Sequence, residues 1–163
     1  MTGKKLAAKR NHINAFEKAY PKWHTEPITK ENIGAVREFH KLWCTSREIG
    51  ENLEEELDAA NLLLSDYFEL GLQGLALYAG GNIVAYSFGE PITEETYCVH
   101  IEKALSDVRG AYPLINREFV RTYCKDYLYV NREDDSGEAG LRKAKMSYKP
   151  YRIVHKYQAE MEK

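Results

Sequence analysis

Apolar residues recur at three- and four-residue spacing in five stretches of the chain, and this period predicts helices. In residues 4–20 the recurring positions include Ile13 and Phe16, and Pro21 ends the pattern because proline cannot continue a helix. Pro113 opens another helix, since the first turn tolerates a residue without an N–H. The remaining helices are predicted over residues 29–43 and 52–68, with Asn52 as an N-cap, and from residue 137 onward.

Short apolar or alternating runs predict strands between these helices. Two of them, residues 75–79 and 83–88, flank Gly80, Gly81 and Asn82, which supply the positive φ of a tight turn and so predict a β-hairpin. The other strands are predicted over residues 23–28, 96–104, 127–130 and 152–157. The predicted order is helix, strand, two helices, a three-strand meander, helix, strand, helix, strand.

Composition adds limits to this picture. A chain of 163 residues with 44% hydrophobic residues and a net charge of −2 suits one globular domain and carries no global basic signature for nucleic acid. The three cysteines (Cys44, Cys98 and Cys124) lack CxxC or Cys/His spacing, so the sequence argues against a disulfide framework and against a zinc site. No apolar run has membrane-spanning length and no signal peptide is evident, so a cytoplasmic location is expected.

Charge is distributed unevenly along the chain. The first 22 residues contain six basic residues and only one acid, Glu17, so a basic helix is expected there whose exposed face could contact phosphates or simply be solvated. A second concentration follows the predicted strand at 127–130. There acids and bases from Asn131 to Lys145 surround a glycine-punctuated turn and an amphipathic helix, a position where α/β proteins bind ligands, although a solvated loop would give the same charges.

The order of elements resembles the GNAT acyltransferase fold, and four segments make the resemblance more specific. They resemble the C-terminal domain of bacterial phosphatidylglycerol lysyltransferases and their soluble relatives. These segments are residues 99–104 (VHIEKA), 110–119 (GAYPLINREF), 131–134 (NRED) and 140–145 (GLRKAK). The resemblance implies an α/β (α+β) fold of the GNAT-like type, with a mixed, mostly antiparallel sheet flanked by helices and central strands that separate to admit an acyl donor.

The resemblance also implies a domain organisation. In the soluble relatives, a basic helix like residues 1–21 connects a first GNAT-like domain to a second one. Residues 22–163 would then be a single GNAT-like domain, the second half of a tandem protein, and an N-terminal GNAT-like domain would be its missing partner.

The implied donor is an aminoacyl-tRNA. Acetyltransferases of this fold hold the pyrophosphate of coenzyme A on a glycine-rich loop at a helix N-terminus. Here Arg109 and Gly110 are the candidate cofactor-binding residues, but Tyr112 and Pro113 replace a small residue and an N–H donor. Acetyl-CoA therefore remains an alternative donor, favoured only if Arg109 and Gly110 form an open phosphate cradle.

Transfer from a tRNA ester needs positioned substrates, a proton acceptor and stabilisation of an oxyanion. Alternation along the strand puts His100 and Glu102 on one face and excludes Lys103 from it. The hypothesis assigns proton transfer or recognition of the donor's amino group to Glu102, Glu133, Asp134 and His100. It assigns substrate binding to Arg132, Arg142, Lys145 and Lys103, with Asn131 as a neutral orienting group.

Alternatives remain open at this point. The charged groups could form only a salt-bridge network, and His100 could be structural. The chain could be an acetyl-CoA-dependent N-acetyltransferase or a non-catalytic GNAT-like binding or dimerisation module with a degraded pyrophosphate loop. The acceptor could be a small molecule, a peptide or a lipid, and the sequence does not distinguish these.

Overall fold

The computed structural model describes residues 3–45, 51–133, 135, 137–155, 157 and 159, without the side chains of residues 51–57. The chain divides into two compact units, Met1–Glu133 and Asp134–Lys163.

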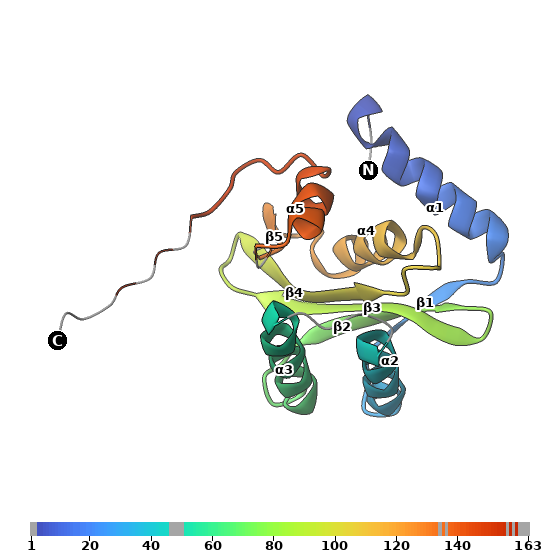
Figure 1. Cartoon of the computed structure of the whole chain (residues 1–163), viewed down its shortest axis with the longest axis horizontal. Coiled ribbons are helices and arrows are strands. Elements are labelled where there is room, and N and C mark those ends of the chain that lie inside the picture. The colour runs from blue at the N-terminus through green and yellow to red at the C-terminus, as the bar shows by residue number, and fades with distance from the viewer. Residues whose placement is uncertain are drawn as a thin grey trace. The chain divides into compact units, whose positions relative to one another are not determined.

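A five-stranded sheet forms the centre of the first unit, in the order β1-β2-β3-β4-β5 (Figure 1). Neighbouring strands are antiparallel except for β4 and β5, which are parallel. Gly80 and Gly81 adopt φ of 61° and 85° in the turn between β2 and β3, which confirms the predicted hairpin. The strands span His24–Pro27 (β1), Gln73–Ala79 (β2), Asn82–Pro91 (β3), Thr96–Ala104 (β4) and Tyr129–Asn131 (β5).

Helices cover both faces of this sheet. On one face lie α1 (Ala7–Ala19) and α4 (Ala111–Tyr123), and on the other α2 (Ile33–Thr45) and α3 (Glu51–Ser65) (Figure 1). Phe16 and Phe119 are fully buried in the core on the first face, and Trp43 is buried in the core on the second. Because both faces are covered, the central strands are apolar without strict alternation. The predicted fold class, a mostly antiparallel sheet flanked by helices, is confirmed.

The local patterns located most helix boundaries well. A 3-10 turn, Lys4–Leu6, leads directly into α1, and together they match the helix predicted over residues 4–20. Helix α2 begins at Ile33 rather than at Thr29, because the Thr29 N–H donates to the side chain of Asn32 and forms a turn before the helix. The capping role predicted for Asn52 falls on a side chain outside the described residues.

A β-bulge in β4 alters which side chains face each layer. Gly89 pairs with Val99 and Phe88 pairs with Ile101, so His100 is an extra residue without a partner position on β3. A Cβ on Gly89 would lie 1.9 Å from the Cys98 carbonyl oxygen, so only glycine permits this close approach. Alternation is interrupted here: Tyr97 and Val99 face the core below α4, whereas Ile101 belongs to the core below α2 and α3.

Strands β4 and β5 pair over only three positions, Thr96–Cys98 of β4 with Tyr129–Asn131 of β5. The rest of β4, as far as Ala104, continues without a ladder to β5. β5 is three residues long, lies at the edge of the sheet and pairs with β4 along its whole length, so the predicted separation of two central strands stays a prediction. Among the described residues, the second half of β4 has no strand partner on its β5 side.

The second unit contains one helix among its described residues, α5 (Ala139–Met146). It begins close to the predicted start after Gly137, which has φ 78°. The strand predicted over residues 152–157 is wrong: residues 152–155 have no strand structure, and Ile153 and Val154 are 59% and 65% exposed. Alternation alone does not make a strand, because a strand needs a partner for its backbone N–H and C=O groups.

Candidate active site at the end of strand β4

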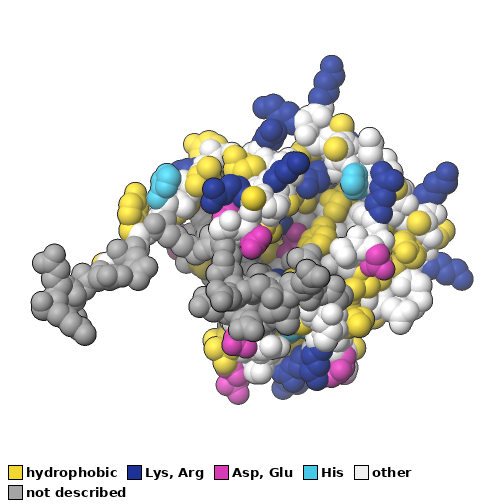
Figure 2. All heavy atoms as spheres, viewed as in Figure 1, with side chains coloured by type: hydrophobic (Ala, Val, Ile, Leu, Met, Phe, Trp, Pro, Cys, Tyr) yellow, Lys and Arg dark blue, Asp and Glu magenta, His cyan; other side chains and the backbone are white. Residues whose placement is uncertain are grey.

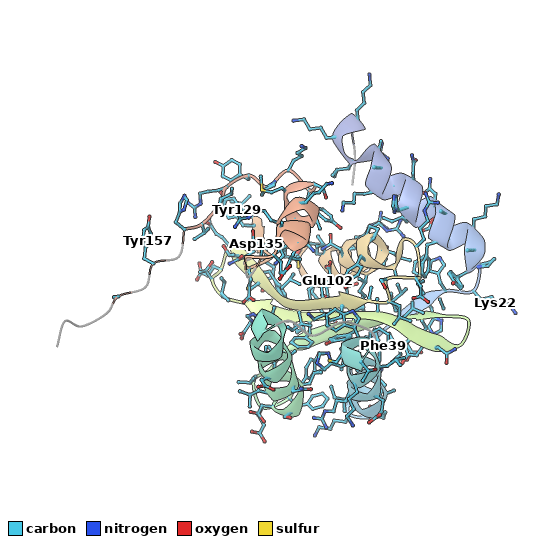
Figure 3. The ribbon with its side chains drawn as sticks, in the orientation of Figure 1. Lys22, Phe39, Glu102, Tyr129, Asp135 and Tyr157 are labelled. Carbon is cyan, nitrogen blue, oxygen red and sulfur yellow. The ribbon has the colours of Figure 1, made fainter. Side chains whose placement is uncertain are left out.

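Polar side chains gather beside β4 where its pairing with β5 ends, and they form two clusters. The Glu102 cluster contains Glu102, Asn116, Arg132 and Lys9. In it, one carboxylate oxygen of Glu102 accepts a hydrogen bond from Arg132 Nη2 at 2.7 Å, and the other accepts from Asn116 Nδ2 at 2.8 Å. Figure 3 shows Glu102 on β4, in the layer that α4 covers.

The Glu102 cluster is a buried ion pair rather than a surface one. The side chains of Glu102 and Arg132 are 10% and 22% exposed, and Asn116 is buried on α4. A charge pair taken out of water persists only with well-placed hydrogen bonds, and here both carboxylate oxygens have them. Glu102 therefore holds the guanidinium of Arg132 in one orientation at the open edge of β4.

Lys9 extends this cluster from α1. Burial lowers the pKa of Lys9, the positive charge of Arg132 lowers it further, and the negative charge of Glu102 opposes both effects. Two basic groups from segments far apart in sequence thus share one carboxylate. The arrangement gives a local excess of positive charge, which favours an anionic ligand.

The second group, the His100 cluster, contains Glu90, Cys98, His100 and Glu133. His100 Nδ1 lies 2.8 Å from Glu133 Oε1, and His100 Nε2 lies 3.0 Å from Glu90 Oε1. The Cys98 thiol lies 3.7 Å from His100 Nδ1 and 3.6 Å from Glu133 Oε1. The imidazole is therefore clamped between two carboxylates, with a cysteine beside one ring nitrogen.

This environment favours the charged imidazolium. Contacts with Cys98 and Glu133 raise the pKa of His100 to about 10, and the bond to Glu90 adds to them, while burial acts in the opposite direction. The predicted pairing of His100 with Glu102 is wrong, because Glu102 bonds to Asn116 and Arg132 while His100 lies beside Glu133 and Glu90. The acid–base role of His100 stays a prediction.

Asn131 and Glu133 form a tight turn after β5. The Asn131 side chain accepts the N–H of Glu133 at 2.8 Å, and Glu133 has φ 54°, a conformation that non-glycine residues adopt rarely. The turn directs Arg132 to one cluster and Glu133 to the other. Asn131 thus orients the site by fixing the backbone, and Asp134, which follows, lies outside the described residues.

The start of α4 differs from an open phosphate cradle. Gly110 caps the helix with φ 93° and is buried, and a Cβ on it would meet the His12 carbonyl oxygen of α1 at 2.3 Å. Helix α1 therefore packs directly over the glycine that a pyrophosphate would approach. Arg109 is exposed beside it, so the two predicted cofactor-binding residues do not form one open pocket.

Lys103 lies on the opposite face of the sheet from Glu102 and does not share its cluster. It is 4% exposed, and its Nζ lies 4.1 Å from the centre of the Trp43 ring on α2. His40 on the same helix is also buried, with Tyr86 Oη 2.8 Å from its Nδ1, as expected of a packed histidine. The predicted substrate-binding role of Lys103 is corrected accordingly, because its amino group is used in the core.

Arg142 and Lys145 belong to the second unit. Arg142 forms two hydrogen bonds to the carboxylate of Asp135, at 2.6 and 3.1 Å, and this contact lowers the pKa of Asp135. Lys145 lies one turn further along α5 and also lowers the pKa of Asp135 through its charge. These bases therefore share a local carboxylate, and their placement in a substrate site stays a prediction.

Sequence reasoning missed four members of the two clusters, Lys9, Glu90, Cys98 and Asn116. Asn116 carried a signal, since a buried amide on the apolar face of a helix needs a partner. No sequence signal pointed to Glu90 or Cys98. These two residues meet only because the strand register places Glu90 opposite Cys98.

An open cavity of about 760 Å³ lies elsewhere in the first unit, near the turn between β3 and β4. Its lining includes Gln73, Ile92, Tyr123 and Asp126, and none of the predicted site residues. The candidate site is thus defined by its polar clusters and by the end of the β4–β5 pairing.

Comparisons with known proteins agree with the fold. A solved structure from Bacteroides thetaiotaomicron VPI-5482, titled a conserved protein of unknown function, is 44% identical, with a TM-score of 0.88 over 93% of this chain and 52% of that one. An uncharacterized protein of Mycoplasmoides gallisepticum is 27% identical over 96% of this chain and 51% of its own length. The chain thus spans about half the length of these relatives.

More distant solved structures share the fold alone. The ribosomal-protein-alanine N-acetyltransferase of Brucella melitensis biovar Abortus 2308 is 14% identical, with a TM-score of 0.56 over 85% of this chain and 99% of that one. AAC(6')-Iy, solved in complex with a bisubstrate analogue, CoA-S-monomethyl-acetylneamine, is 11% identical, with a TM-score of 0.58 over 86% of this chain and 98% of that one. Among the described residues, no helix combines the length and apolar character of a membrane span.

The sequence model of one family, described as phosphatidylglycerol lysyltransferase, C-terminal, matches residues 1–160. That match covers nearly the whole chain and confirms the resemblance seen in its motifs. With the acetyltransferase fold, it supports an acyltransferase at the level of the superfamily. The chain belongs to the phosphatidylglycerol lysyltransferase C-terminal family.

Proposed function

We propose that this chain transfers an aminoacyl group from an aminoacyl-tRNA to an amine or hydroxyl acceptor. The observation that carries the proposal is the buried Glu102–Arg132 ion pair beside β4, just past the point where the pairing of β4 with β5 ends. An acyl donor of the resembled superfamily enters between these strands. A fixed guanidinium at that opening suits the carbonyl oxygen or a phosphate of such a donor.

Aminoacyl transfer needs few other groups from the protein. An aminoacyl ester is already activated, so the site has to position it and stabilise the negative charge that develops on the carbonyl oxygen. Arg132 is suited to this role because Glu102 and Asn116 hold it before substrate arrives. A donor group that needs no reorganisation during the reaction stabilises the transition state most effectively.

The start of α4 favours a tRNA donor over acetyl-CoA. Coenzyme A would need its pyrophosphate near Gly110, but the carbonyl of His12 occupies that approach. A carbonyl oxygen repels phosphate rather than binding it. The acetyltransferase alternative therefore requires α1 to move.

Basic residues at the N-terminus suit a polyanionic donor. Lys4, Lys5 and Lys18 are exposed along the 3-10 turn and α1, and Figure 2 shows Lys and Arg side chains gathered on that edge of the molecule. Each phosphate contact would add a sequence-independent and salt-sensitive contribution to tRNA binding.

Proton removal from the acceptor is assigned to Glu133, the exposed carboxylate of the His100 cluster, since the imidazolium of His100 cannot accept a proton. Glu133 is 39% exposed and hydrogen-bonded to His100, so an acceptor group can reach it. The acceptor itself is a small molecule, a peptide or a lipid. Because the chain spans about half of its relatives, an additional GNAT-like domain before it is part of this proposal.

The test is calorimetric binding of a non-hydrolysable aminoacyl-adenosine analogue, with acetyl-CoA measured in parallel. The expected result is saturable binding of the analogue, weakened at least about tenfold by Arg132→Gln because one charge-assisted hydrogen bond is lost. Arg121→Gln is the matched control, since Arg121 is 61% exposed and pairs with Glu118 on α4. It should bind like the original protein.

Two outcomes would contradict the proposal. Tight binding of acetyl-CoA that Arg109→Ala weakens would identify an acetyltransferase. The second outcome is that neither donor binds, either to this chain alone or to a chain extended to the full length of its relatives. That result would favour a non-catalytic module.

A further inference from the structure

Three potential metal ligands meet in the His100 cluster. Cys98 Sγ, His100 Nδ1 and Glu133 Oε1 all lie within 4.8 Å of one another, and they form the one such trio among the residues whose positions are described. Cys98 is 3% exposed, whereas the side chains of His100 and Glu133 are 17% and 39% exposed. One side of the trio is thus sealed by protein and the other is open to solvent.

The spacing of these atoms suits a tetrahedral zinc ion. With ordinary zinc–ligand bond lengths, tetrahedral geometry separates nitrogen from oxygen by about 3.3 Å and sulfur from either by about 3.5 Å. In the protein, sulfur lies 3.7 Å from Nδ1 and 3.6 Å from Oε1, and Nδ1 lies 2.8 Å from Oε1. Only the last pair has to open, by about half an ångström, to admit the ion.

Glu90 supplies the support that a metal-bound histidine normally has. A ligating imidazole usually donates its other N–H to a carboxylate, which fixes the ring and increases its basicity. His100 Nε2 already lies 3.0 Å from Glu90 Oε1, so Nδ1 is the nitrogen left for a metal. The contact between Glu90 and His100 does not involve the three proposed ligand atoms, and it gives separate support for a metal bound at His100 Nδ1.

The backbone places these side chains without relying on the ion. Cys98 is paired with Glu90 on one side and with Asn131 on the other, so the sheet register fixes both neighbours. The bulge at His100 and the positive φ of Glu133 bring their side chains to that point. Bulges and rare backbone conformations of this kind concentrate at functional sites.

We propose that Cys98, His100 and Glu133 bind a zinc ion, with Glu90 orienting His100. A water or substrate atom would occupy the fourth position on the exposed side, as in zinc sites that retain an open coordination position. Zinc replaces the proton shared by His100 and Glu133 and the proton of the Cys98 thiol. The inference does not rest on the proposed transfer reaction, because its test measures zinc binding alone. In the zinc-bound protein Glu133 is a ligand, so the atom that removes the acceptor's proton would be the water held in the fourth position.

The first measurement is a zinc titration of the untagged, metal-stripped chain against a chromophoric chelator. The expected stoichiometry is one. Cys98→Ser and Glu133→Gln should each weaken binding at least about 100-fold, and Glu90→Gln by about 10- to 100-fold, the usual effect of losing an outer partner. Circular dichroism melting of each metal-free variant checks that it folds.

Cys44→Ser is the matched control. Its thiol also lies beside a histidine, 3.5 Å from His40 Nε2, but that histidine is bound on its other nitrogen by Tyr86 and is not part of the trio. Zinc binding should be unchanged in this variant. If Cys44→Ser removes zinc binding, or if Cys98→Ser and Glu133→Gln retain it, the proposed ligands are wrong.

Cobalt gives a second readout that does not depend on affinity. Co²⁺ bound to the trio should show the intense thiolate charge-transfer absorption in the near ultraviolet, and Cys98→Ser should abolish it while Cys44→Ser retains it. A weak octahedral spectrum without that band, or no stoichiometric zinc binding, would overturn the proposal.

Discussion

Two basic side chains, Lys103 and Arg132, lie on opposite faces of the sheet. Comparing them shows that deep burial of a charge does not by itself indicate a functional site. Lys103 is almost fully buried, with its ammonium over the ring of Trp43. Arg132 is more exposed, yet it is held by a carboxylate at the open edge of β4. The more deeply buried charge is therefore part of the core, and the one at the strand opening is the better candidate for function.

The same contrast holds for two histidines, one buried and one partly exposed. His40 faces Tyr86 and Trp43 in an aromatic core, whereas His100 lies between two carboxylates and a thiol at a bulge. A histidine that is satisfied by packing is common. One held by several ionisable groups at a strand break is typical of a site.

The largest expected effect comes from removing the bulge that separates these environments. Gly89→Ala places a methyl group against the Cys98 carbonyl, and we expect a loss of about 3–4 kcal/mol in the free energy of unfolding. Zinc binding should be lost too, since the register of Cys98 and His100 changes. Urea denaturation monitored by circular dichroism measures the effect.

Gly34→Ala is the control for that substitution. Gly34 lies in α2 with no atom within 4 Å of its expected Cβ, so alanine should stabilise the protein by about 0.5–1 kcal/mol. Equal effects of the two substitutions would mean that the close approach at Gly89 does not shape β4.

An intermediate effect is expected from Glu102→Gln. The change keeps the shape of the side chain but leaves Arg132 without its buried carboxylate, which should cost about 1–3 kcal/mol. Aminoacyl-analogue binding should fall with it, because Arg132 loses its fixed orientation. Glu38→Gln, which breaks an exposed pair with Lys41, should change stability by less than about 0.5 kcal/mol.

The smallest expected effect comes from Lys103→Met. Loss of the contact with Trp43 should cost about 1–2 kcal/mol, offset in part because methionine fills an apolar space well. Analogue binding, measured by calorimetry, should not change. A selective loss of binding in this variant would reverse the assignment of the two basic residues.

The sequence by itself determined the elements whose signals are local. Proline stops, paired glycines in a turn and helical periodicity located α1, the β2–β3 hairpin and α4, because these depend on neighbouring residues and backbone sterics. The motifs also led to the family. The strand predicted over residues 152–157 failed, since alternation does not provide a pairing partner.

The tertiary structure decided which charges meet. Alternation put His100 and Glu102 on one face, but the bulge across from Gly89 separated them and gave His100 to Glu133 and Glu90. Register placed Cys98 beside them, and the packing of α1 closed the approach to Gly110. These outcomes depend on strand pairing and on contacts between segments up to about a hundred residues apart, which no local pattern in the sequence encodes.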